Sequence, residues 1–156
     1  MPVTDVPSAV RLERTIPAPV EQVYRAWLDP ELIVRWMNPG TFTVSRVEVD
    51  ERLGGAYRIW HAEHGVELGG FDCQVTALEP NRRIAFLWGF VGPERRQGPA
   101  YDSVLTVTLA PTADGATALT LVHERLDALA DAMPEAAGQV RGGWDDVLGK
   151  LAALLS

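Results

Sequence analysis

The side chain best suited to acid–base chemistry in this sequence is His123. It alternates with Leu119 and Leu121 in a segment of strand-like periodicity, so the three side chains share one face, which we expect to be buried. An imidazole in an apolar pocket can orient a ligand or transfer a proton near neutral pH, and His123 is therefore the candidate catalytic residue. The alternative is a buried histidine that is hydrogen-bonded to backbone groups or water and has no chemical role.

Aromatic side chains are the second feature that could form a site. The chain has five tryptophans, and each can serve as core packing with a bonded indole N–H or as the wall of an apolar ligand pocket. Ile84, Phe86 and Trp88 share one strand face, while Tyr101 carries a hydroxyl that could orient a ligand. The predicted ligand-binding residues are Trp36, Trp60, Phe86, Trp88, Tyr101, Leu121, His123 and Trp144.

The sequence predicts no metal centre and no cofactor. His61, His64 and Glu67 lie beside a predicted hairpin turn, where we expect an exposed turn, because a metal would need a further converging ligand. Cys73 alternates with apolar neighbours and is predicted to lie in the core, without a neighbouring base that would activate it. Phosphate-binding glycine loops and paired-cysteine motifs do not occur in the sequence.

Two further groups have both a structural and a functional interpretation. Asp50, Arg52 and Arg58 flank a glycine turn and could form ion pairs or bind an anion. Gly142 and Gly143 lie inside a predicted helix, where each costs about 1 kcal/mol relative to alanine. Close packing of the helix on a sheet would explain this pair, and so would space left for a ligand.

The elements that must position these side chains follow from hydrophobic periodicity. Residues 135–156 carry apolar side chains at spacings of three and four, which predicts one long helix with a single apolar face. The predicted strands are residues 10–16, 43–49, 56–61, 66–78, 83–90, 103–109 and 117–124, and two short helices are predicted after Pro19 and Asp29. Connections of hairpin length favour an antiparallel sheet.

Length and composition define the class of protein. The 156 residues predict a flexible leader at residues 1–9 and one α+β domain at residues 10–156. The net charge of -7 argues against binding nucleic acid, and no apolar run is long enough for membrane insertion. A single cysteine and the lack of a signal peptide in the first residues predict a cytoplasmic protein.

Short motifs in a fixed order carry a resemblance to a known family. They are Ile16-Pro17-Ala18-Pro19, Asp29-Pro30, the D-x-R-x-G-G-x-Y-R stretch from Asp50 to Arg58, Leu78-Glu79-Pro80-Asn81-Arg82 and Gly142-Gly143-Trp144. Their order and spacing resemble the START-like (SRPBCC) superfamily, and within it the family named for activators of the heat-shock-protein-90 ATPase. The resemblance implies a helix-grip fold, in which a curved antiparallel sheet wraps around the long C-terminal helix and two short helices follow the first strand.

Three functions are compatible with this fold. The first is binding of a small hydrophobic or amphipathic molecule in a cavity between sheet and helix. The second is a cyclase, dehydratase or isomerase that uses the same cavity, with His123 as the acid–base group. The third is a chaperone-linked interaction domain with a solid core and an exposed apolar patch. In the eukaryotic activators a separate N-terminal domain engages the chaperone, and this chain contains none, so we do not expect a chaperone partner.

Overall fold

The structure is a computed structural model of the chain, and it describes residues 9–91, 102–127, 129 and 134–156. The strands are β1 (Val10–Ile16), β2 (Thr43–Val49), β3 (Ala56–Glu63), β4 (Val66–Glu79), β5 (Arg83–Val91), β6 (Asp102–Pro111) and β7 (Thr117–Glu124). The helices are α1 (Val20–Leu28), α2 (Pro30–Trp36) and α4 (Pro134–Leu155). Every predicted strand and helix is present, with ends that differ by a few residues.

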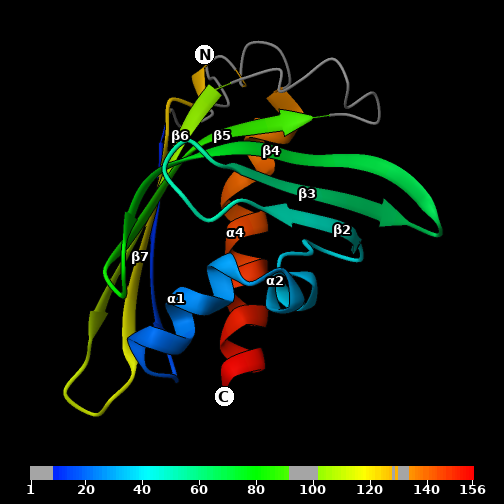
Figure 1. The fold of residues 1–156 in the computed structure, drawn as a ribbon. Coiled ribbons are helices and arrows are strands. Elements are labelled where there is room, and N and C mark those ends of the chain that lie inside the picture. Colours follow the sequence, from blue (N-terminus) through cyan, green and yellow to red (C-terminus); the bar gives the residue numbers. More distant parts are fainter. Residues whose placement is uncertain (1–8, 92–101, 128, 130–133) are drawn as a thin grey trace, which may run out of the picture.

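The seven strands form one antiparallel sheet in the order β1-β7-β6-β5-β4-β3-β2. The first strand therefore pairs with the last, and Val10 lies opposite His123. Figure 1 shows that the sheet curves and that α4 lies across its inner face, with α1 and α2 beside the C-terminal half of α4. This arrangement confirms the predicted α+β helix-grip fold.

Alternation along the strands decides which side chains enter the core. In β7 the buried residues Leu119, Leu121 and His123 alternate with more exposed ones, as predicted. The β3–β4 hairpin contains a register shift after His61, opposite Gly69, whose φ of 112° is a conformation that favours glycine. Such an irregularity bends the strands close to the hairpin turn.

The helices begin where local chemistry allows. Asp29 caps α2, because its carboxylate accepts a hydrogen bond from the Glu31 backbone N–H at 2.9 Å, and Pro30 follows at the first helical position. The apolar face of α4 buries Val140, Trp144, Val147, Leu148 and Leu151. None of the helices described here has the length and apolar character that crossing a membrane requires.

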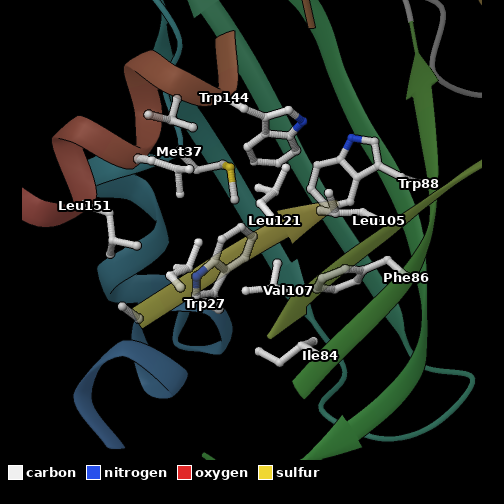
Figure 2. Close-up of a cluster of buried hydrophobic side chains, with 14 of the residues drawn as sticks. Trp27, Met37, Ile84, Phe86, Trp88, Leu105, Val107, Leu121, Trp144 and Leu151 are labelled. Carbon is white, nitrogen blue, oxygen red and sulfur yellow. The ribbon is translucent and has the colours of Figure 1, made fainter. Parts of the chain in front are cut away.

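The core lies between α4 and the central strands (Figure 2). Trp27 is its centre: the ring packs edge-on against Trp36 at 4.7 Å and lies 6.0 Å from Trp144. Ile84, Phe86 and Trp88 of β5 face the same interior and are fully buried, as their strand parity predicts. This packing fixes the C-terminal half of α4 on the sheet, whereas the N-terminal half of α4 borders a cavity.

Candidate functional site: an apolar cavity beside the C-terminal helix

A cavity of about 1050 Å³ lies between the first half of α4, strands β3 to β5 and the segment that joins α2 to β2. Its size is at the upper end of the range for sites that hold drug-sized ligands. The lining residues are Met37, Pro39, Gly40, Thr41, Phe42, His61, Leu68, Gly69, Gly70, Phe71, Trp88, Phe90, Val91, Gly138, Gln139, Val140, Gly142, Gly143, Trp144, Asp146 and Val147.

Aromatic rings form a continuous wall on the sheet side of this cavity. Phe71 lies 4.8 Å from Trp88 and 5.7 Å from Phe90, measured between ring centroids. Trp144 of α4 completes the wall, 5.3 Å from Trp88. Rings at these distances and at tilted or edge-on angles make favourable contacts with one another, so together they form an apolar surface.

Three glycines lie on the helix side of the cavity, among other residues of α4. A methyl group built on Gly142 or Gly143 would meet nothing within 4 Å, and the same holds for Gly138 one turn earlier. Close packing of α4 on the sheet is therefore not the reason for the glycine pair, and that interpretation is wrong at these positions. The other interpretation, space beside the helix, agrees with the geometry.

A polar clamp holds α4 against the segment between α2 and β2. The Asp146 carboxylate accepts a hydrogen bond from the Gly40 backbone N–H at 2.8 Å and lies 3.1 Å from the Lys150 ammonium. Lys150 also donates to the backbone carbonyls of Asn38 and Gly40. The Gly40 hydrogen bond and then the Lys150 interaction lower the pKa of Asp146. The rim of the cavity is thus fixed by charge-assisted bonds.

His123 is the centre of a buried chain of hydrogen bonds next to the cavity wall. The Trp144 indole Nε1–H donates to His123 Nδ1 at 3.0 Å, so Nδ1 carries no proton and the neutral ring is protonated at Nε2. His123 Nε2–H then donates to Ser103 Oγ at 2.6 Å, and the Ser103 hydroxyl donates to the Trp88 carbonyl at 2.8 Å. Both ring nitrogens are therefore occupied within the protein.

The environment of His123 keeps the ring uncharged. The side chain has no exposed surface, and burial lowers its pKa from 6.5 to about 3. Phe90 stacks on one face of the ring at 5.9 Å, with only 8° between the planes. The geometry therefore supports the structural interpretation of His123, in which it positions Trp144 and does not face the cavity itself.

Some of the predicted site residues line the cavity, and others lie in the hydrophobic core. Trp88 and Trp144 line the cavity, and His123 lies directly behind Trp144. Trp36, Phe86 and Leu121 are fully buried and are not among the lining residues, because they pack in the core instead. The Trp36 N–H donates to the Ala26 carbonyl at 3.0 Å. Tyr101 lies outside the described residues.

Trp60 was predicted to bind the ligand, but the structure places it away from the cavity. Tyr57, Ile59 and His61 alternate as buried residues along β3, so Trp60 points to the opposite face of the sheet. There the guanidinium carbon of Arg46, its pairing partner on β2, lies 5.0 Å from the ring centroid. Trp60 is thus a surface cation–π partner and has no contact with the cavity.

His61 is one of several lining residues that the sequence analysis did not predict, and Phe71 and Phe90 are others. The expectation of an exposed turn is wrong for it, because β3 continues to Glu63 and His61 is only 4% exposed. Its Nε2 lies 2.8 Å from the Met37 carbonyl, and its ring lies edge-on to Phe71 at 5.1 Å. The alternation with Tyr57 and Ile59 was the signal that could have placed it inward.

The remaining polar candidates have structural partners. Arg52 pairs with Asp50 at 2.7 Å, and Arg58 pairs with Asp72 at 3.2 Å on the outer face of the sheet. Cys73 is buried, as predicted. Within the described part of the chain, no group of three or more histidine, cysteine or acidic side chains is arranged to hold a metal ion.

Comparison with known proteins identifies the family. The family model described as "Activator of Hsp90 ATPase homolog 1-like protein" matches residues 17–156. The chain belongs to this family. The predicted membership in the START-like superfamily is therefore confirmed. No curated protein matches the chain.

Solved structures of similar proteins share the fold. A protein from Chromobacterium violaceum is 34% identical with a TM-score of 0.77, and the match covers 96% of this chain and 98% of that one. A protein from Mycobacterium smegmatis is 23% identical with a TM-score of 0.78, covering 99% and 98%. DynU16, described as a protein in the dynemicin biosynthetic locus, is 27% identical with a TM-score of 0.70, covering 96% of this chain and 47% of its own.

Proposed function

We propose that this family member binds a small hydrophobic or amphipathic molecule in the cavity between α4 and the sheet. The observation that carries the proposal is a cavity of about 1050 Å³ that is lined by aromatic rings on the sheet side and by glycines and apolar side chains of α4 on the helix side. Burial of an apolar ligand there would contribute roughly 25 cal/mol per Å² of apolar surface, before the costs of ordering.

A binding role is better supported than catalysis by the described residues. The ionisable side chains among the described lining residues are His61 and Asp146, and Asp146 is already bonded to Gly40 and Lys150. His123, the acid–base candidate, has both nitrogens engaged and a pKa of about 3. An acid–base catalyst that works near neutral pH needs a pKa much closer to 7.

A protein-interaction role has less support. It requires an exposed apolar patch, whereas the large exposed apolar side chains among the described residues are divided between α2, β4 and one turn. They are Val34, Leu53, Val66 and Leu68. Leu68 also lines the cavity, so part of this exposure belongs to the mouth of the proposed binding site.

The first experiment combines native mass spectrometry of the purified protein with a thermal-shift screen of apolar and amphipathic compounds. A ligand at a hundred times its Kd stabilises the folded state by about 2.7 kcal/mol, which raises Tm by roughly 5–10 °C in a chain of this size. A retained small molecule or a shift of this order supports the proposal. An empty protein that no compound stabilises would refute it.

Two glycine variants localise the binding. Gly143→Leu places a side chain in the open space of the cavity, whereas Gly149→Leu places the same side chain on the exposed face of the same helix, where an added Cβ also meets nothing within 4 Å. We expect Gly143→Leu to lose the thermal shift and Gly149→Leu to keep it. Equal shifts in both variants would mean that the ligand binds elsewhere.

A further inference from the structure

The charges around the cavity restrict the ligand that it can hold. The described lining residues include no arginine and no lysine, and the one carboxylate among them is Asp146. The chain as a whole carries a net charge of -7. A carboxylate or phosphate buried in this cavity would lose its hydration without gaining a cationic partner among the described lining residues. An uncharged ligand avoids this cost.

The wall of the cavity also contains one unused hydrogen-bond donor. The indole Nε1 of Trp88 is buried and has no hydrogen-bond partner among the described residues. The indole N–H of Trp144, whose ring lies beside that of Trp88 in Figure 2, donates to His123. A buried N–H without an acceptor is unfavourable, so an oxygen that reached Trp88 Nε1 would be held by the full strength of a desolvated hydrogen bond.

We propose that the cavity selects an uncharged ring compound with a carbonyl-type oxygen, which accepts the hydrogen bond of Trp88 Nε1–H. This inference rests on the proposed function and names the chemical class of its ligand. The half-buried rings of Phe71 and Phe90 supply the stacking surface, and the oxygen supplies the acceptor that Trp88 lacks. The Trp88 side chain and its Nε1 are buried, so the oxygen reaches this nitrogen only after a neighbouring side chain turns aside.

Three compounds with the same ring system test this inference by titration calorimetry. Fluorenone has a neutral carbonyl, fluorene has no acceptor, and fluorene carboxylate is an anion at neutral pH. We expect fluorenone to bind about tenfold more tightly than fluorene, as one recovered hydrogen bond implies, and the carboxylate to bind most weakly. Equal binding of fluorenone and fluorene, or tightest binding of the carboxylate, would overturn the inference and leave the proposed function standing. No binding by any of the three or by any compound of the thermal screen would refute the proposed function itself.

Two tryptophan variants assign the effect to one indole. Trp88→Phe keeps a ring but removes the N–H, so we expect the preference for fluorenone over fluorene to disappear. Trp27→Phe is the matched control, because Trp27 Nε1 is also buried with no partner in the described part of the chain, and Trp27 is not among the described lining residues. The control should keep the preference, and loss of the preference in Trp27→Phe alone would contradict the assignment.

If Trp88→Phe does not fold, a spectroscopic measurement on the unmodified protein tests the same hydrogen bond. Five indole N–H resonances are expected in a proton–nitrogen correlation spectrum, one for each tryptophan. Fluorenone should move the Trp88 resonance strongly downfield, as a new hydrogen bond does, and fluorene should not. Identical shifts with both compounds would overturn the inference.

Discussion

At the scale of single residues, His123 shows how a titratable group can be held in one state. Its Nδ1 accepts the Trp144 N–H, so a proton can bind this nitrogen only if that hydrogen bond breaks. The folded protein therefore keeps the ring neutral, with a pKa of about 3 against 6.5 for a free histidine. Trp144, and with it one wall of the cavity, depends on this neutral form.

The depressed pKa of His123 makes stability depend on pH. Between about pH 6.5 and 3 the unfolded chain binds one more proton at this site than the folded chain, so the free energy of unfolding falls by about 1.4 kcal/mol per pH unit on acidification. We expect His123→Leu to destabilise the protein by roughly 1–3 kcal/mol near pH 7, because it leaves the Trp144 N–H without an acceptor. The difference should shrink towards pH 5, as measured by urea denaturation.

The wild-type protein and His123→Leu contain the same carboxylates, so the titration of these groups cancels in the difference between the two unfolding free energies. His123→Gln provides a second comparison, because its amide oxygen can still accept from Trp144 but does not titrate. A difference in unfolding free energy that stays constant from about pH 7 to about pH 5 would contradict a neutral buried histidine.

Sequence reasoning placed His123 inward but could not reveal its partners. Alternation along one strand determines the face of a side chain, and this was sufficient for Leu119, Leu121 and His123. Ser103 and Trp144 come from β6 and α4, and which atoms meet across elements depends on register and helix rotation. The site of hydrogen bonding therefore became visible only in the folded structure.

At the scale of elements, α4 combines a packing half and a cavity half. Its later residues Leu148 and Leu151 are buried in the core, whereas Gly138, Gly142 and Gly143 border open space. Glycine inside a helix costs free energy that alanine does not, and here the added methyl group would meet no atom. The cost is therefore not offset by packing in the empty protein.

Gly142→Ala and Gly143→Ala should each stabilise the empty protein by about 1 kcal/mol, because the higher helix propensity of alanine has no steric penalty to oppose it. Urea denaturation of the single variants measures this directly. Destabilisation by either substitution would show that α4 does pack closely at that position.

Lys150 should control how firmly α4 holds the rim of the cavity. Lys150→Met removes the bonds to Asn38, Gly40 and Asp146, and we expect a loss of about 1 kcal/mol together with faster amide exchange at Gly40. Arg141→Met is the control, because it removes the same charge from an exposed position of the same helix. Equal effects of the two variants would contradict the clamp.

The elements themselves were predictable because each has a local signature. Strand alternation, the Asp29-Pro30 start of α2 and the three-and-four spacing of α4 all follow from nearby residues. The cavity was not predictable in the same way. Its volume depends on how far the Gly142–Gly143 face stands from the sheet and on the rotamers of Phe71 and Phe90, which are set by contacts between distant segments.

At the scale of the whole molecule, the curved sheet encloses two different interiors. One is the filled core around Trp27 and Phe86, and the other is the cavity beside β3, β4 and β5. Trp88 and Trp144 form the boundary between them, 5.3 Å apart. A ligand in the cavity would thus contact α4 and the sheet together and would stabilise the packing of one on the other.

The central claim is that an apolar molecule occupies the cavity, and contacts measured by nuclear Overhauser effects test it most directly. With the strongest compound from the screen bound, we predict contacts from the ligand to the methyl groups of Val140 and Val147, which line the cavity. Contacts confined to the methyl groups of Leu53 and Val66, which are exposed apolar residues elsewhere on the surface, would contradict the claim.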